Sequence, residues 1–227
     1  MDDDPAGPAA PAGQPAAQPA GRSRHDAGQT RIAILAAARA VLLEDGYANL
    51  STRRVAEAAD VPLSQIHYHF GSKQQLILGV LAAQTERLLE RQAEMYGGPE
   101  PLWVRWQRAC DFLEVDLESG YVRILQELIA AGWSDPELAA SVREQLGGWF
   151  SLLTAVAQRT SDAIGGLGPF TPAEVAALMG LSFVGAESAI LLGMTEDQLP
   201  TRSALRKLGD VIRDIETRNM GEASDDR

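Results

Sequence analysis

The amino-acid sequence predicts an all-α protein, with a small helical domain at the N-terminal end and a larger helical domain after it. Apolar residues recur three and four positions apart along most of the chain, the spacing that gathers them on one face of a helix. Turn residues separate these periodic segments, and the strict alternation typical of strands is nearly absent. A length of 227 residues, 45% of them hydrophobic and 22% charged, suits one large or two small globular domains.

The boundary between the two domains is expected at Gly97-Gly98-Pro99, where the chain leaves a long predicted helix. The first domain then covers residues 22–96 and the second covers residues 97–218. Residues 1–21 are rich in Pro, Ala and Gly, and residues 219–227 are polar and acidic. Neither tail can bury enough apolar surface to offset the entropy lost on ordering, so both are predicted to be disordered.

Four helices are predicted in the first domain. The first, at residues 30–44, is amphipathic and stops at Asp45-Gly46. Two short helices follow at residues 52–59 and 63–70, and a long one is expected at residues 72–96, after a capping box. The inward face predicted for the first helix consists of Ile32, Ile34, Leu35, Ala38, Val41 and Leu42.

Five helices are predicted in the second domain, and two of them begin with clear capping signals. Thr171-Pro172-Ala173-Glu174 supplies a cap, a proline at the first helical position and a glutamate at the third. Ser134-Asp135-Pro136-Glu137 follows the same pattern, and Thr201 is expected to cap the last helix. The five helices are expected at residues 100–118, 121–131 and 134–164, from 171 onward, and from 201 onward.

Charge is distributed unevenly along the chain. The sequence has 20 Lys and Arg against 31 Asp and Glu, and the net charge of -11 by itself argues against a nucleic-acid partner. Residues 22–73, however, carry seven Lys or Arg against five Asp or Glu, together with all three histidines. The acidity therefore belongs to the second domain, and the two short helices lie in the one relatively basic stretch.

Two short helices that are joined by a tight turn and braced by longer ones are typical of a helix-turn-helix, whose second helix enters the DNA major groove. The residues in and around this unit resemble the N-terminal domain of TetR-family transcriptional regulators over about residues 28–90. The resemblance is carried by Ser51-Thr52-Arg53-Arg54-Val55-Ala56, Ala59-Asp60-Val61 and His67-Tyr68-His69-Phe70-Gly71-Ser72-Lys73. The chain departs from the family pattern at Asp60 (usually Gly), Pro62 (usually Ser), and His67 and His69 (usually Tyr).

The resemblance implies a homodimer that binds double-stranded operator DNA. Thr52 and Arg53 at the start of the second helix, and Lys73 at the start of the fourth, are expected to contact phosphates, since hydroxyl, basic and N–H groups at helix starts position the duplex. In the third helix, Gln65 can bond to adenine with both amide groups, and Leu63 can touch a thymine methyl. The groove contacts are expected from Leu63, Ser64, Gln65, His67 and Tyr68.

The second domain contains most of the aromatic residues, which is typical both of an ordinary core and of a ligand cavity. The resemblance favours a cavity for a small-molecule effector of unknown identity. Glu187 stands alone in an apolar helix, and the residues leave open whether it anchors a ligand or has a partner at a dimer seam. The candidate ligand-binding residues are Trp103, Trp133, Trp149, Phe183 and Glu187.

The last two predicted helices offer a surface for a second copy of the chain. Gly180, Gly185 and Gly193 permit close approach of backbones, and an apolar stripe follows on the last helix. Packing of these helices within one chain is the alternative, but a single helix-turn-helix usually needs its twin for affinity. The stripe consists of Leu205, Leu208, Val211, Ile212 and Ile215.

Other kinds of site are disfavoured. No catalytic residue is predicted, because no nucleophile–base pair or phosphate-binding loop has a recognised spacing. No metal or cofactor is expected: His67 and His69 are two positions apart on a helix and do not face each other, and Cys110 is expected to be a small buried residue. Residues 175–194 are long and apolar enough to span a membrane, but Glu187 lies among them, so a buried helix is expected.

The sequence therefore predicts a cytoplasmic transcriptional regulator that represses from a palindromic operator until a small molecule releases it. Two alternatives stay open. An all-helical enzyme would need titratable groups that converge in the second domain. An interaction scaffold would keep the helix-turn-helix but lack DNA binding, as the acidic net charge allows.

Overall fold

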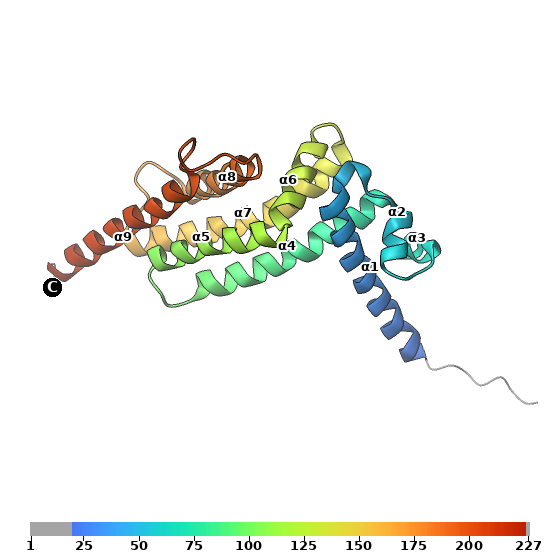
Figure 1. Ribbon diagram of the computed structural model, residues 1–227. Helices are drawn as coiled ribbons and strands as arrows, with labels where there is room; N and C mark the ends of the chain where they lie inside the picture. The colour runs from blue at the N-terminus through green and yellow to red at the C-terminus, as the bar shows by residue number, and fades with distance from the viewer. Residues whose placement is uncertain (1–19, 226–227) are drawn as a thin grey trace, which may run out of the picture.

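A computed structural model describes residues 20–225, and every regular element in that range is α-helical, as predicted (Figure 1). The helices of the described range are α1 (Ala20–Asn49), α2 (Thr52–Ala58), α3 (Leu63–Phe70), α4 (Lys73–Gly97), α5 (Leu102–Ser119), α6 (Tyr121–Gly132), α7 (Pro136–Ile164), α8 (Pro172–Leu191) and α9 (Thr201–Asp225).

The first helix is longer than predicted at both ends. It begins at Ala20, because Ala, Arg and Gln residues before position 30 are good helix formers. The left-handed backbone of Gly46 (φ 76°) interrupts it near the predicted stop, and a last turn then continues to Asn49. Ile32 is 67% exposed and does not belong to the inward face, because it lies about 200° around the helix from Ile34.

The two predicted disordered tails are only partly within the described range. Residues 20 and 21 belong to α1, and residues 219–225 continue α9, so the disorder predicted there is wrong. Residues 1–19 and 226–227 lie outside the described residues. Helix formers such as Met220, Glu222 and Ala223 prolong α9 beyond the predicted end of the second domain.

Most predicted helix starts agree with the observed caps. The Ser72 hydroxyl accepts a hydrogen bond from the Gln75 N–H (3.1 Å) at the start of α4. Thr171 and Glu174 form the complete capping box of α8. Two starts differ by a residue: Asp135 rather than Ser134 caps α7, and Thr201 is the first residue of α9 rather than its cap.

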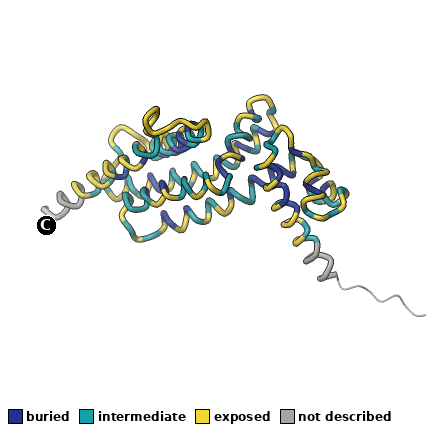
Figure 2. Tube along the Cα trace, in the orientation of Figure 1, coloured by how far each residue is buried: buried dark blue, intermediate teal, exposed yellow. Residues whose placement is uncertain are grey.

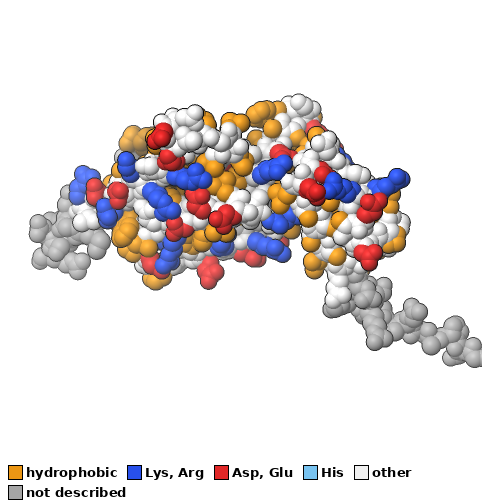
Figure 3. Space-filling model, in the orientation of Figure 1, with side chains coloured by type: hydrophobic (Ala, Val, Ile, Leu, Met, Phe, Trp, Pro, Cys, Tyr) orange, Lys and Arg blue, Asp and Glu red, His pale blue; other side chains and the backbone are white. Residues whose placement is uncertain are grey.

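The helices form an elongated body with the short helices at one end. In Figure 1, α4, α5 and α7 run side by side along the body, α8 and α9 cover one side of it, and α1–α3 project at the end opposite the C-terminus. Buried residues follow the inner sides of the body helices and the junction of α1 with α4 (Figure 2). Acidic and basic side chains are interspersed over the face that Figure 3 shows.

Two hydrophobic clusters fill the described part of the chain, and α4 contributes to both. The first holds α1–α3 together and extends into α6 and the start of α7, through residues such as Val122 and Leu138. The second lies in the body and contains Tyr96, Trp106 and Phe183. Within this cluster α1 packs on α6 and on α4, and α3 packs on α4. The short helices are therefore joined to the body through α1 and α4.

α8 is long and apolar enough to cross a membrane by length and composition alone. Such a helix is weak evidence for a span, because the core helix of a globular protein has the same properties. One side of α8 packs on α7, whereas Leu178 and Leu181 on its other side are exposed.

Candidate nucleic-acid interface and internal cavity

The turn between α2 and α3 has the geometry that a helix-turn-helix requires. Asp60 adopts a left-handed conformation (φ 52°), and it is the one non-glycine residue of the described range that does so. The Val61 N–H donates to the Ala56 carbonyl (3.0 Å), which closes the turn. Ile66 and Phe70 anchor the inner face of α3 in the first hydrophobic cluster. The opposite face of α3 is thereby held outward.

The outward face of α3 carries four of the five predicted groove residues, whereas Leu63 packs against the first hydrophobic cluster on the side of Ile66 and Phe70. Ser64, His67 and Tyr68 are exposed, the Tyr68 side chain by 78%, and Leu63 and Gln65 are half-buried at the base of the helix. The His67 ring nitrogen Nδ1 lies 3.3 Å from the Gly71 carbonyl oxygen. The Tyr68 and His69 rings meet edge to face, with centroids 5.0 Å apart. This surface combines amide, hydroxyl and imidazole groups, which are the groups that bond to base edges.

The three residues predicted to contact phosphates flank α3. Arg53 is exposed on α2, whereas the neighbouring Arg54 is engaged by Glu44 (2.7 Å) and Asp45 (2.5 Å). Thr52 is half-buried at the first position of α2. The Lys73 ammonium lies at the start of α4, donates to the Ala48 carbonyl (3.2 Å) and sits over the Tyr47 ring. A positive charge and helix N–H groups therefore lie on either side of the recognition helix α3.

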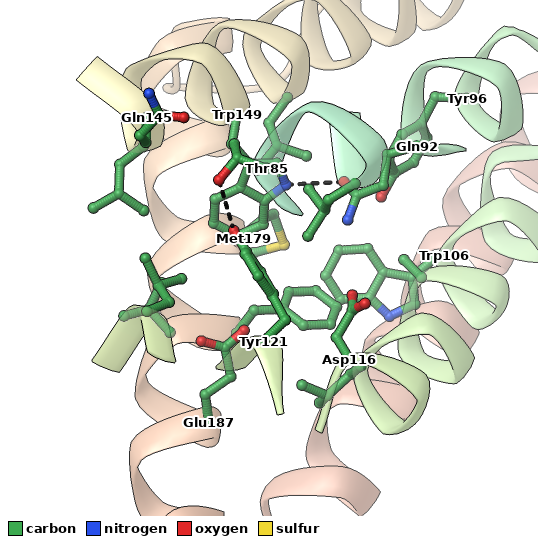
Figure 4. Close-up of a pocket in the computed structure, with 18 residues that line it drawn as sticks. Thr85, Gln92, Tyr96, Trp106, Asp116, Tyr121, Gln145, Trp149, Met179 and Glu187 are labelled. Atoms are coloured by element: carbon green, nitrogen blue, oxygen red, sulfur yellow. Dashed lines mark hydrogen bonds between the residues drawn. The ribbon is translucent and has the colours of Figure 1, made fainter. Parts of the chain in front are cut away.

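An internal cavity of about 50 Å³, the inner chamber, lies where α4, α5, α6, α7 and α8 meet (Figure 4). Its walls are largely aromatic: the Trp106 and Phe183 rings stand 5.4 Å apart, and Tyr121 and Trp149 complete the enclosure. Two hydrogen bonds fix the walls. Thr85 Oγ1 and the Tyr121 hydroxyl lie 3.3 Å apart, and the Trp149 indole N–H donates to Gln92 (2.9 Å).

Two carboxylates face the inner chamber from opposite helices (Figure 4). Glu187 on α8 accepts a hydrogen bond from the Gln126 amide at 3.1 Å, and burial raises the pKa of its carboxyl to about 7. Asp116 on α5 pairs with Arg91 (2.7 Å), and burial raises its pKa as well. Burial also raises the pKa of Tyr121 to about 12, so this phenol stays neutral. The chamber thus offers hydrogen-bond acceptors in an apolar enclosure.

A second and larger cavity of about 510 Å³, the outer chamber, lies between α5, α7, α8 and α9. It shares Tyr96, Trp106, Leu153 and Met179 with the inner chamber, so the two are adjacent. Its walls are mostly aliphatic. Glu216 reaches its rim, where the carboxylate accepts hydrogen bonds from the N–H groups of Leu102 and Trp103. The remaining wall includes Val156, Ala157, Ile164, Leu167, Val175, Ala176, Ile212 and Ile215.

The structure brings together three of the five predicted ligand-binding residues. Trp149, Phe183 and Glu187 line the inner chamber. Trp133 does not: it follows α6 at the turn to α7 and is 84% exposed. Trp103 lines neither chamber and lies under the Arg213 guanidinium at 5.6 Å. Glu187 points into the cavity rather than along the exposed side of α8 (Figure 4), a position that fits its interpretation as a polar anchor.

Several cavity residues were not among the predicted ones. Tyr96 and Trp106 belong to the apolar faces of α4 and α5, where nothing local separates a cavity wall from ordinary core. Asp116 and Tyr121 lie near the α5–α6 junction and become cavity residues only because α4 and α8 close over them. The signal that could have found Asp116 is its place on the same helical face as Phe112 and Leu113, which is unusual for a charged residue.

The glycines of α8 have different surroundings. A Cβ atom on Gly180 would stand 2.4 Å from the Phe150 ring, so this glycine permits α7 and α8 to pack within one chain. Gly185 has open space around it and lies on the exposed side, and Gly193 (φ 77°) belongs to the turn after the helix. The predicted α9 stripe also divides: Leu205 is buried and its carbonyl accepts from the Trp106 indole N–H (2.7 Å), whereas Val211 and Ile215 are exposed.

The predicted burial of Cys110 agrees with the structure. Burial raises the pKa of its thiol to about 11. Among the described residues no group of three or more His, Cys, Asp or Glu side chains is placed to hold a metal ion.

The chain matches known proteins in the region of the helix-turn-helix and over most of the fold. The family model described as bacterial regulatory proteins, tetR family, matches residues 34–80, which contain α2 and α3. The HTH-type transcriptional regulator UidR of Escherichia coli (strain K12) is 26% identical over 147 residues, which cover 61% of this chain and 68% of UidR.

Solved structures with the same fold include regulators and their ligand complexes. A TetR-family transcriptional regulator from Rhodococcus sp. superposes with a TM-score of 0.68 at 22% identity, over 82% of this chain and 98% of that one. FadR from Bacillus subtilis in complex with stearoyl-CoA gives 0.67 at 15% identity, over 78% and 96%. A transcriptional regulator from Saccharomonospora viridis in complex with choline gives 0.65 at 18% identity, over 79% and 95%.

Proposed function

The chain belongs to the TetR family of DNA-binding transcriptional regulators, and we propose that it represses transcription from a palindromic operator until a small molecule enters its internal cavity. The observation that carries the proposal is the coexistence of two surfaces in one chain: the exposed polar face of α3 and the buried, polar-ended cavity of the body. The relatives it matches are regulators, so no catalytic activity is proposed.

The proposed interface with operator DNA uses α3 for bases and the flanking helix starts for phosphates. Gln65 and Tyr68 provide the principal base contacts, supported by Leu63, Ser64 and His67. Thr52, Arg53 and Lys73 position the duplex, since contacts to phosphates set register without reading sequence. The proposed DNA-binding domain comprises residues 22–96, and residues 97–218 form the effector and dimerisation domain.

The proposed homodimer forms through the exposed sides of α8 and α9. Leu178, Leu181 and the open backbone at Gly185 supply an apolar face on α8, and Val211 and Ile215 extend it on α9. Such pairing supplies two copies of α3, one from each chain, for the two half-sites of an operator. A palindromic operator then presents its half-sites about 34–36 Å apart, one turn of the double helix. We place the protein in the cytoplasm, where its operator lies.

The proposed release mechanism uses α6, which lines the cavity on one side and contacts the end of α1 on the other. Tyr121 and Leu125 of α6 line the inner chamber, and Gln126 holds Glu187. On the same helix, Arg123 donates to the Leu43 carbonyl (2.9 Å) and Glu127 accepts from the Tyr47 N–H (2.6 Å).

These contacts connect the cavity to the end of α1, beside α2. A ligand that binds the DNA-incompetent arrangement more tightly shifts the population toward it, and operator DNA must weaken ligand binding by the same factor.

The proposal is tested by measuring DNA binding of the full chain by fluorescence anisotropy. The probes are labelled fragments of the DNA upstream of its own gene, with a scrambled fragment of equal length as control. We expect a preference of at least about a thousandfold for one upstream fragment at physiological salt. Tyr68→Ala, which changes an exposed side chain of α3, should remove that preference, whereas Val115→Ala on the exposed side of α5 should keep it. Equal affinity for all fragments would contradict DNA recognition and favour the interaction scaffold.

A further inference from the structure

The two chambers of the body differ in chemistry although they share a wall. The inner chamber has polar groups at its closed end, among them Glu187, Asp116 and Tyr121. The outer chamber is lined almost wholly by aliphatic and aromatic carbon. Trp106 and Met179 border both. A molecule that fills both chambers therefore needs a polar end and an apolar body.

The polar end of the chambers is short of hydrogen-bond donors. Gln126 bonds to Oε2 of Glu187 and Arg91 bonds to Oδ2 of Asp116, which leaves Glu187 Oε1 and Asp116 Oδ1 without a hydrogen bond in the described part of the chain. Within that part, no Lys, Arg or His side chain lines either chamber. Neither oxygen belongs to the fully buried atoms that lack a partner, so a molecule in the chamber can reach both. In an apolar enclosure a carboxylate is best satisfied by a hydrogen-bond donor or a cation. The missing partner is a donor, and preferably a positive one.

The walls around these oxygens favour the same partner. The Trp106 and Tyr121 rings lie close to Glu187 and Asp116 (Figure 4), and Phe183 lines the same chamber. Aromatic faces attract cations through the ring quadrupole, most strongly when the cation is desolvated. An anionic head would meet two acidic side chains and no lining cation. The charge of the site therefore disfavours a carboxylic acid as the occupant.

The volumes of the chambers limit the shape of the occupant. About 50 Å³ holds only a few water-sized groups, since one water needs about 10–15 Å³. This room suits a primary or secondary ammonium rather than a quaternary one. The outer chamber, at about 510 Å³, lies within the usual range for a ligand site and accepts a long apolar body.

We propose that the effector is an amine with a compact ammonium head, bound between Glu187 and Asp116, and a long apolar body in the outer chamber. The word effector rests on the proposed function, whereas binding of the amine to the chambers does not. Glu187 is the principal ion-pair partner, because Asp116 already pairs with Arg91.

The test compares four probes that share one tail and differ only in the head: decylammonium, decyltrimethylammonium, decanol and decanoate. Binding to the full chain is measured by calorimetry below the micellar concentrations. A charge-assisted hydrogen bond is worth about 1.5–3 kcal/mol, so decylammonium should bind about tenfold or more tighter than decanol. Decyltrimethylammonium should bind more weakly than decylammonium, and decanoate should bind weakest.

Substitutions in the inner chamber test where the ammonium head of the ligand binds. Glu187→Gln keeps the shape of the side chain and removes its charge, so the affinity for decylammonium should fall about tenfold while that for decanol stays within about threefold. Asp116→Asn should weaken decylammonium in the same direction. Glu118→Gln is the matched control, because Glu118 is exposed on α5 and lines neither chamber. Thermal unfolding of each variant verifies that it is folded.

The possible failures are distinguishable. Tighter binding of decanoate or decanol than of decylammonium, or an unchanged decylammonium affinity in Glu187→Gln, would overturn the amine assignment and leave operator binding untouched. Equal binding of decyltrimethylammonium would overturn the compact head. If decylammonium binds as expected but the protein shows no preference for any upstream DNA fragment, the proposed function is wrong and the ligand assignment stands.

Discussion

The recognition helix and the inner chamber present their polar groups in opposite ways. The polar side chains of α3 point outward from a helix of eight residues. The placement of this helix depends on the turn at Asp60, which is at most ten residues from any residue of α3. The chamber side chains point inward from five helices, and their contacts join residues such as Gln126 and Glu187, 61 positions apart. The DNA surface is therefore a local feature that packing supports. The cavity exists only when the whole body has folded.

The largest expected effect tests whether operator affinity depends on the body as well as on α3. Leu181→Glu places a charge on the exposed apolar side of α8, where the residue is 59% exposed, and should prevent pairing of two chains. Without its twin each α3 binds alone, so operator affinity should fall about a hundredfold or more. Val115→Glu, at a 51% exposed position on α5, is the control. A Leu181→Glu protein that sediments as a dimer and binds operator normally would rule out this face.

Burial of Glu187 in the chamber should make the stability of the protein depend on pH. Burial raises the pKa of Glu187 from 4.5 to about 7, with Gln126 as hydrogen-bond donor and Asp116 facing it. The folded chain therefore holds an extra proton between these pH values, and its stability falls as pH rises through them. Each pKa unit corresponds to about 1.4 kcal/mol, so the loss is up to about 3 kcal/mol.

Glu187→Gln tests this dependence by urea unfolding at pH 5 and pH 8. The variant should be the more stable protein at pH 8, where the parent must bury a charge, and the difference should largely vanish at pH 5. A difference of equal size at both pH values would mean that the Glu187 charge is not what burial opposes.

Within the proposed DNA-binding surface, loss of a base contact and loss of a phosphate contact should have different effects on binding. Gln65→Ala should cost about 1–3 kcal/mol on the preferred operator and relax the preference at one base pair. Lys73→Ala should weaken all sequences alike and reduce the salt dependence, although loss of its Ala48 contact adds a small local effect. Binding to a panel of operators with single base-pair changes distinguishes the two. If Lys73→Ala altered base preference and Gln65→Ala did not, the orientation assigned to α3 would be wrong.

The smallest expected effect compares two adjacent arginines on α2. Arg53 is exposed without an ion pair in the described range, whereas Arg54 is held by Glu44 and Asp45. Arg53→Ala should lower affinity and reduce the slope of log affinity against log salt by about one. Arg54→Ala should leave that slope unchanged and have little effect on stability, since exposed ion pairs contribute little. The reverse result would assign the phosphate contact to Arg54.

The difference between the two regions also decides how far sequence alone could lead. Asp60 at the turn, Ile66 and Phe70 as anchors and the Thr171–Glu174 cap each follow from a few neighbouring residues, and the structure agrees with all of them. Residue type alone did not predict which residues line the cavity. Trp133 looks like a wall residue but lies at a turn, because being a tryptophan does not fix the side of the body that it faces.

Asp116 shows the opposite error. Its place on the apolar face with Phe112 and Leu113 is the one local sign of burial, and its partner Arg91 lies 25 positions away on α4. The lengths of α1 and α9 were likewise underestimated. Their end segments are rich in helix-forming residues but lack the apolar periodicity from which helices are predicted. Long-range partners, which no local pattern encodes, account for what could not be predicted.

The position of α9 has a consequence for how two effector sites would respond to one another. Ile212 forms part of the wall of the outer chamber, and Val211, next to it on the same helix, faces outward on the side proposed for dimerisation. If two chains pair through this side, α9 of each protomer lies between its own outer chamber and the partner. A ligand that displaces α9 in one protomer would then change the interface, so the first and second molecules would bind with different affinities. The saturation curve should then depart from a simple hyperbola, with a Hill coefficient that differs from one.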